Sequence, residues 1–229
     1  MPLITSIDDF SNGLQLAIWR ADGNEVKHLQ QTGLAPSWWT PPENIVHPRR
    51  QLEWLAARAA AVHLLQAPQA QHCTLSRGKE GQPVLAGCDL SLSLTHSKGY
   101  AAAVLGNGLL GVDLEQIQPE KSLESASMFM GKEELDWFRS LNKEEALNVF
   151  YLIWSTKEGL YKALNRKLGG GLSFRKHLRV RLLNQSLQTS QVEMLTTCSH
   201  PNFEFHQHKQ MYWRALKFSN FWLTWGRIA

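Results

Sequence analysis

The sequence predicts an α+β fold built from two successive parts, each containing a helix and several strands in the same order. In the first part, an alanine-rich amphipathic segment at residues 49–65 predicts a helix, and strand-like segments follow it. In the second part, a proline-free segment at residues 143–164 has apolar residues at helical spacing, and strand-like segments follow again. With 229 residues and 43% hydrophobic content, the chain can bury a substantial core.

The first part is expected to begin with a strand at residues 14–19, where apolar and polar residues alternate. A loop-rich stretch at residues 36–48 precedes the helix, which ends before Pro68 because proline cannot continue a helix. Three strands are expected after it, at residues 71–75, 92–95 and 100–105. Gly106-Asn107-Gly108 tolerate positive φ, so the last of these strands is expected to form a hairpin with the next one, which carries Asp113.

The second part is expected to contain a short helix at residues 132–140 and the long helix already named. Strands are then expected at residues 178–183, 192–197, 211–218 and 221–225. Between the hairpin and the short helix, residues 122–131 carry three apolar side chains, Met128, Phe129 and Met130. These side chains either form a surface for a partner helix or pack against the next helix of the chain.

Two charged residues interrupt the apolar stripes of the long helix. Glu158 shares a stripe with Leu147, Tyr151, Trp154 and Tyr161, and Lys157 shares the neighbouring stripe with Phe150, Ile153, Leu160 and Leu164. Because an unpaired buried charge is costly, such residues are usually paired, bound to a metal or directed at a ligand. The alternative is that Lys157 extends to solvent and Glu158 forms an ion pair with Lys162, one turn later.

Asp113 and Glu115 are expected on one face of the strand that carries them. Side chains alternate along a strand, so Val112 and Leu114 point one way and the two carboxylates the other. Two carboxylates at this spacing repel each other unless a positive charge lies between them, and Mg²⁺ prefers such oxygen ligands. The alternative is a solvated strand face with two ordinary acids.

Together, these two segments resemble a known signature. Gly-Val-Asp-Leu-Glu at residues 111–115, followed by Trp-Ser-x-Lys-Glu-x-x-x-Lys from Trp154, is similar to the signature pair of the 4'-phosphopantetheinyl transferases, in particular the two-lobed Sfp-type branch. The resemblance implies a pseudo-dimer of two α/β lobes with the active site in the cleft between them. It places the N-terminal lobe at residues 1–108, with the nucleotide contacts, and the C-terminal lobe at residues 109–229, with the metal site and catalytic helix.

The N-terminal part also resembles this family. Ser-Leu-Thr-His-Ser, which contains His96, is similar to the family's Ser-x-Ser-His-Ser segment, and Arg58 matches an arginine that holds the coenzyme A 3'-phosphate. Leu-Gly-Gly-Gly-Leu-Ser from residue 168 resembles a glycine-rich segment near the nucleotide. The sequence departs from the family at Gln82, which stands where a Gly-Lys-Pro element has its lysine. Lys79 could supply the missing charge.

The resemblance implies transfer of phosphopantetheine from coenzyme A to a serine of an apo acyl or peptidyl carrier protein, with release of adenosine 3',5'-bisphosphate. Asp113, Glu115 and Glu158 would bind Mg²⁺, or alternatively Mn²⁺. Glu158 would also accept the proton of the serine, Lys157 would stabilise the leaving phosphate, and Lys162 would contact phosphate or hold Glu158. Arg58, His96 and the position of Gln82 or Lys79 would bind coenzyme A.

Composition gives weaker indications. The net charge of +4 suits a phosphate-rich ligand and an acidic partner, and no basic run with interleaved aromatics indicates nucleic acid. The cysteines, Cys73, Cys88 and Cys198, show neither a disulfide framework nor a zinc spacing, which favours a reducing compartment. The first residues lack a basic, apolar leader, and no stretch is long enough for a membrane span. We therefore expect a cytoplasmic protein, monomeric because two lobes complete its site.

Two other classes use the same residues. A metal-dependent phosphodiester hydrolase would use the three carboxylates with water as the nucleophile and would release phosphopantetheine without a carrier protein. A non-catalytic module would bind the carrier or coenzyme A, and Gln82 would then reflect lost activity. An experiment with coenzyme A and an apo carrier separates these three classes.

Overall fold

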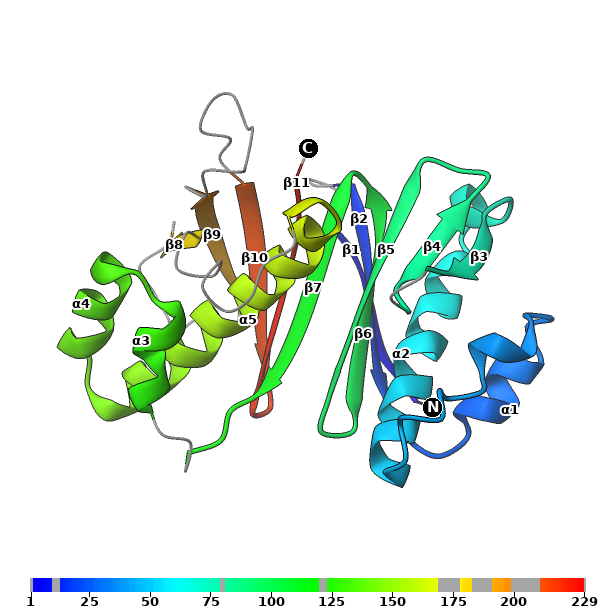
Figure 1. Cartoon of the computed structure of the whole chain (residues 1–229), viewed down its shortest axis with the longest axis horizontal. Helices are drawn as coiled ribbons and strands as arrows, with labels where there is room; N and C mark the ends of the chain where they lie inside the picture. Colours follow the sequence, from blue (N-terminus) through cyan, green and yellow to red (C-terminus); the bar gives the residue numbers. More distant parts are fainter. Residues whose placement is uncertain are drawn as a thin grey trace. The chain divides into compact units, whose positions relative to one another are not determined.

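The chain forms two compact units, Met1–Leu110 and Gly111–Ala229. A computed structural model, shown in Figure 1, describes residues 2–9, 13–78, 81–119, 123–168, 178–182, 191–198 and 211–228; the side chains of residues 165–168, 191–198 and 211–212 are not included in this description. Within the described residues, no helix is both long and apolar enough to cross a membrane.

The first unit is built on a four-stranded sheet in the order β1-β2-β6-β5. These strands are β1 (Leu3–Asp9), β2 (Leu14–Arg20), β5 (Leu90–Ser97) and β6 (Tyr100–Asn107), and neighbouring strands are antiparallel. Helix α2 (Pro48–Leu65) packs on one face of this sheet (Figure 1), and its alanines meet the small side chains of β6. Because these side chains are small, the helix axis can lie close to the sheet.

Smaller elements complete the first unit. Helix α1 (Glu25–Gln30) packs beside α2, and β3 (Thr74–Arg77) and β4 (Pro83–Ala86) form a separate antiparallel hairpin. Two short 3-10 helices lie at η1 (Pro36–Trp38) and η2 (Pro68–Ala70).

The second unit has a five-stranded sheet in the order β7-β11-β10-β9-β8. Its strands are β7 (Leu109–Gln116), β8 (Leu178–Leu182), β9 (Gln191–Cys198), β10 (Met211–Phe218) and β11 (Phe221–Ile228). Helix α5 (Lys143–Leu168) crosses one face of this sheet and packs mainly on β11 (Figure 1). The shorter helices are η3 (Leu123–Ser125), α3 (Ala126–Phe129) and α4 (Lys132–Ser140).

The three predicted helices are confirmed as α2, α4 and α5, and the predicted strands are found with ends shifted by a few residues. The three apolar residues of segment 122–131 differ in exposure. Met128 is 52% exposed, whereas Phe129 and Met130 are buried. Phe129 lies against the rings of Phe150 and Trp154 of α5. Two of the three side chains therefore pack within the chain.

The predicted hairpin between the strand at residues 100–105 and the strand with Asp113 is wrong. Strand β6 pairs with β2 along one edge and with β5 along the other, so it has no free edge for β7, which pairs with β11. Gly108 does adopt positive φ, at 87°, but the chain turns there from one sheet into another. His96 and Asp113 consequently lie in different sheets and not on neighbouring strands.

The interpretation of the cysteines is also corrected. Cys73 and Cys88 form a disulfide across a sequence separation of 15 residues, with their Cα atoms 5.4 Å apart. They flank the β3–β4 hairpin, which brings its two ends together. The spacing of two cysteines does not reveal such a pairing when the hairpin between them is unknown. The inference of a reducing compartment loses its support.

Removal of this disulfide is expected to destabilise the first unit by about 3 kcal/mol, because a loop of about 15 residues regains its freedom in the unfolded chain. Urea unfolding with and without a thiol reductant measures this difference. The Cys73→Ser/Cys88→Ser double variant serves as the control, because its stability should not respond to the reductant. Equal stability of the oxidised and reduced protein would contradict the prediction.

Candidate active site

Asp113 of β7 and Lys162 of α5 form an ion pair in the second unit. The Lys162 Nζ donates to Asp113 Oδ1 at 2.7 Å and to the backbone carbonyl of Val112 at 3.0 Å. The side chain of Asp113 is only 8% exposed, whereas that of Lys162 is 33% exposed. The buried Asp113 carboxylate is thus covered by α5, and the Lys162 ammonium group lies between it and solvent.

Glu115, two residues further along β7, is held by the same helix. The indole N–H of Trp154 donates to Glu115 Oε1 at 2.9 Å. Because both Lys162 and Trp154 reach from α5, Asp113 and Glu115 face the helix, as strand alternation predicts. Ser155 adds a contact to the strand by donating to the Asp113 carbonyl at 3.1 Å.

Glu158 lies midway between Trp154 and Lys162 on α5. The three residues are spaced four apart, so they follow one another along the same side of the helix. Trp154 contacts Glu115 and Lys162 contacts Asp113, so Glu158 belongs to the side of α5 that carries both contacts with β7. Glu158 is partly exposed. The grouping of Glu158 with Asp113 and Glu115 in one metal site stays a prediction.

Close contact between α5 and β7 depends on glycine. A methyl group at Gly111 would overlap the carbonyl oxygen of Gly159, and one at Gly159 would lie 2.6 Å from Cζ3 of Trp213. Trp213 is fully buried, and its ring also fills the space that a side chain at Gly226 would need. Two backbones can approach this closely only where neither carries a Cβ. Glycines and a tryptophan thus set the height of the helix above the strand.

Lys157 lies on the neighbouring stripe of α5 and points into the protein interior. It is fully buried, and its Nζ donates to Glu134 Oε2 at 2.5 Å and to the Phe129 carbonyl at 2.9 Å. Burial lowers the pKa of Lys157, while the charge and the hydrogen bond of Glu134 partly offset this effect. The other residues of its predicted stripe are buried as well: Phe150, Ile153, Leu160 and Leu164.

The predictions for the charged residues of α5 are therefore revised. The alternative that Lys157 extends to solvent is wrong, because its ammonium group is buried against Glu134. Lys162 pairs with Asp113, a strand carboxylate that the sequence did not indicate as its partner. The periodicity correctly indicated burial at position 157 but could not identify the partner.

Sequence reasoning missed Glu134. Its carboxylate accepts hydrogen bonds from Gly131 N and Val180 N, both at 2.8 Å, in addition to the contact with Lys157. It therefore joins the N-terminus of α4, the middle of α5 and strand β8. The only local signal was a glutamate three residues after Gly131, a spacing typical of a helix N-terminus.

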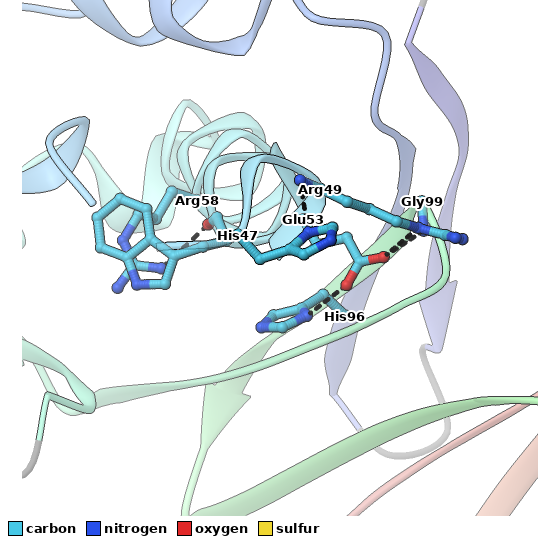
Figure 2. A network of polar contacts seen from close by, with 7 residues as sticks. His47, Arg49, Glu53, Arg58, His96 and Gly99 are labelled. Carbon is cyan, nitrogen blue, oxygen red and sulfur yellow. Dashed lines mark hydrogen bonds and ion pairs between the residues drawn. The ribbon is translucent and has the colours of Figure 1, made fainter. Parts of the chain in front are cut away.

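In the first unit, Glu53 of α2 binds three groups (Figure 2). Its carboxylate accepts from Gly99 N at 2.8 Å and Arg49 Nε at 3.2 Å, and the Nδ1 of His96 lies 3.5 Å away. Glu53 is 7% exposed, whereas the side chain of His96 is 37% exposed. A buried carboxylate thus holds the partly exposed imidazole at the end of β5.

Arg58 lies on the same helix, one turn beyond Glu53 (Figure 2). It is 5% exposed, and its Nη1 donates to the Trp54 carbonyl at 3.0 Å. Gln82 lies in the turn between β3 and β4, directly before β4, and its backbone carbonyl accepts a hydrogen bond from Gly78 N at 2.8 Å. Lys79 and the glycine-rich segment after Leu168 lie outside the described residues.

Comparison with known proteins assigns these residues to one family. The family model of the 4'-phosphopantetheinyl transferase superfamily matches residues 109–223, half of the chain, and the model of the 4'-phosphopantetheinyl transferase N-terminal domain matches residues 43–106. The chain belongs to the 4'-phosphopantetheinyl transferase superfamily. The predicted resemblance to this family is confirmed.

Relatives in the superfamily carry the same name. The chain is 32% identical to the 4'-phosphopantetheinyl transferase AcpT of Escherichia coli K12 over 50% of its length and 58% of that protein. It is 32% identical to HetI of Nostoc over 44% of both chains. It is also 32% identical to Sfp of Bacillus subtilis, over 37% of this chain and 36% of that protein. The chain spans about half the length of the curated relatives it matches.

The two superfamily matches divide the candidate residues into the same two groups as the structure does. The match at residues 109–223 includes the β7–α5 group, with Asp113 and Glu158. The match at residues 43–106 includes Arg58, Gln82 and His96. The superfamily assignment thus covers every residue that the sequence singled out.

Proposed function

We propose that this protein transfers the 4'-phosphopantetheine group of coenzyme A to a serine hydroxyl of an apo acyl or peptidyl carrier protein, releasing adenosine 3',5'-bisphosphate. One observation carries the proposal. Trp154 and Lys162 of α5 bind the Glu115 and Asp113 carboxylates of β7, with Glu158 between them, inside the region that matches the superfamily. The names of the relatives support the same reaction.

The carboxylates of the second unit suit a hard divalent cation. No group of three acidic, histidine or cysteine side chains in the described part of the chain is close enough to enclose a metal by itself. Mg²⁺, however, is usually held by one or two carboxylates together with substrate phosphates. Asp113 and Glu115 provide two carboxylates on one strand face, and Glu158 provides a third from the helix. These three carboxylates, together with phosphate oxygens of coenzyme A, would hold Mg²⁺, or Mn²⁺ in its place.

When bound, the cation would neutralise charge on the pyrophosphate of coenzyme A. The protein's own residues would position the groups that react. Glu158 would accept the proton of the attacking serine, directly or through a water, while the bond between phosphorus and the bridging oxygen breaks. Lys162 would contact phosphate from its place beside Asp113. The serine oxygen would form the new bond to the phosphorus of the phosphopantetheine group, and the nucleotide half of coenzyme A would leave with the bridging oxygen as adenosine 3',5'-bisphosphate.

Lys157 is proposed to stabilise the position of helix α5 and not to contact the substrate. The sequence predicted a contact with the leaving phosphate, but the ammonium group is fully buried against Glu134 and the Phe129 carbonyl. A lysine in this position fixes the rotation of α5 and so the direction of Glu158, the next residue of the helix. Residues of the first unit, Arg58 and His96 foremost, would bind the nucleotide end of coenzyme A.

Asp113→Asn is expected to lower the transfer rate at least about 100-fold without unfolding the protein, because it removes one carboxylate charge and keeps the side-chain shape. The measurement is the intact mass of a panel of apo carrier proteins after incubation with coenzyme A, Mg²⁺ and the enzyme. Asp136→Asn, an exposed change on α4, is the control and should retain the wild-type rate.

The same assay decides the function. Addition of one phosphopantetheine to a carrier supports the proposal. Phosphopantetheine released without any carrier would identify a hydrolase, and carrier binding without any change of mass would identify a binding module. Either of these results would overturn the transferase proposal, and an unchanged rate in Asp113→Asn would overturn the role of this carboxylate.

A further inference from the structure

The two carboxylate oxygens of Glu53, a buried residue of α2, bind different groups (Figure 2). Oε1 accepts hydrogen bonds from Gly99 N at 2.8 Å and from Arg49 Nε at 3.2 Å. Oε2 lies 3.5 Å from Nδ1 of His96, within ion-pair distance. A glutamate is seldom buried unless it is paired, and here the partners come from α2 itself, from the end of β5 and from the turn that follows β5.

The turn between β5 and β6 contains a strained residue. Lys98 has a φ of 48°, in the left-handed region that a residue with a side chain rarely adopts. Such a conformation persists only where the surrounding structure holds it. The hydrogen bond from Gly99 N, the next residue, to Glu53 is a contact of this kind. Because His96 lies two residues before Lys98, the same contact fixes the end of β5 against α2.

The ring of His96 has one nitrogen toward Glu53 and the other away from it. Nδ1 faces the carboxylate, and Nε2 lies on the opposite side of the ring (Figure 2). The side chain of His96 is 37% exposed and that of Glu53 only 10%, so the imidazole lies between the buried carboxylate and solvent. A carboxylate beside Nδ1 keeps a proton on that nitrogen and stabilises the doubly protonated imidazolium. In this form Nε2 also donates a hydrogen bond.

We infer that Glu53 is a positioning residue for coenzyme A, which acts through His96 and does not touch the ligand. The carboxylate sets the orientation of the imidazole and supports its positive charge, so that Nε2 donates to a phosphate of the coenzyme. This inference rests on the proposed function, in which His96 binds the nucleotide end of coenzyme A. Glu53 was not among the site residues that the sequence predicted.

A double-mutant cycle on binding of coenzyme A tests whether Glu53 acts through His96. Isothermal titration calorimetry should show that Glu53→Gln and His96→Gln each weaken binding about tenfold, a loss similar to that caused by removing the partner of a metal-binding histidine. The double variant should bind within about twofold of His96→Gln, because the two residues act as one unit. If the two losses multiply instead, Glu53 acts independently of the imidazole and the inference is overturned.

Two-bond ¹H–¹⁵N NMR spectra follow the imidazole itself, and the His96→Gln spectrum assigns its signals. The neutral ring of the wild type should carry its proton on Nδ1, which faces Glu53. In Glu53→Gln, the amide oxygen is expected to keep the contact with Gly99 N, which turns the amide nitrogen toward the ring. The proton should therefore move to Nε2. Unchanged His96 signals in Glu53→Gln would overturn the inference.

Glu25→Gln is the matched control. Glu25 is also a buried glutamate of the first unit, 1% exposed, and it accepts from Asp22 N at 2.7 Å and Gly23 N at 3.0 Å. Its substitution should leave both the affinity for coenzyme A and the His96 signals like those of the wild type. An equal loss of affinity in this control would show that Glu53→Gln acts only through lower stability, and would overturn the inference.

Failure of the proposed function would give a different result. The wild type would then modify no carrier protein, while the coupling between Glu53 and His96 could still be measured from binding of coenzyme A. A wild type that binds no coenzyme A would overturn both proposals.

Discussion

Glu134→Gln is expected to destabilise the second unit by about 3–5 kcal/mol. The substitution leaves the Lys157 ammonium group, which is fully buried, without the carboxylate that now contacts it at 2.5 Å. It also removes one acceptor oxygen from a side chain that binds both Gly131 N and Val180 N. Urea unfolding monitored by circular dichroism measures the loss, with fluorescence of the buried tryptophans as a second probe.

Two controls isolate the buried charge. Glu133→Gln removes the neighbouring ion pair with Arg179, whose side chains are 68% and 61% exposed, and should cost less than about 1 kcal/mol. Lys157→Met combined with Glu134→Gln removes both charges and should recover at least about 2 kcal/mol relative to Glu134→Gln alone. If the two substitutions were simply additive, the coupling between these residues would be disproved.

The loss should also depend on pH in a defined direction. Burial lowers the pKa of Lys157 below its ordinary value of 10.5, and Glu134 opposes this shift, so the substitution should lower the pKa further. Between the lowered pKa of the folded protein and 10.5, the unfolded chain binds more protons than the folded one, and stability rises with pH. The Glu134→Gln protein should therefore approach the wild type as the pH is raised toward 10, and the double variant should not.

The contrast between Glu158 and Lys157 shows which features of a helical residue apolar periodicity can predict and which it cannot. Both residues were singled out because they interrupt apolar stripes, and for Glu158 the stripe gave the side of the helix that faces β7. The same argument indicated that Lys157 is buried. It could not indicate Glu134 as the partner, because a contact across 23 residues depends on how α4 packs, which the local sequence does not encode.

The elements that the sequence missed share this dependence on distant contacts. The hairpin prediction relied on turn residues at 106–108, whereas pairing of β6 was decided by β2, almost ninety positions earlier. The disulfide between Cys73 and Cys88 depended on the β3–β4 hairpin. Helices α2, α4 and α5 were predicted well because their apolar spacing is local. Local patterns therefore indicated the elements and the candidate residues, and pairing between strands required the structure.

Gly111→Ala is expected to cost more than about 3 kcal/mol, above the usual range for overpacking, because its methyl group would meet backbone and not a side chain that can move aside. Strand β7 and helix α5 would have to separate.

Gly159→Ala tests the same contact from the side of the helix. In an open helix this change would gain about 1 kcal/mol, but here the methyl group would press on the buried ring of Trp213, so a net loss is expected.

Gly33→Ala is a control that introduces backbone strain without the steric overlap expected at Gly111 and Gly159. Gly33 has a φ of 71°, and a methyl group added there would have nothing within 4 Å, so the change should cost only about 1–2 kcal/mol. Under the proposed function, Gly159→Ala should also lower transfer in the folded protein, because raising α5 draws Lys162 away from Asp113. Unfolding experiments and the carrier-mass assay on the same samples measure both effects. A stabilised Gly159→Ala protein with wild-type transfer would show that the close approach of α5 to β7 matters neither to the fold nor to the site.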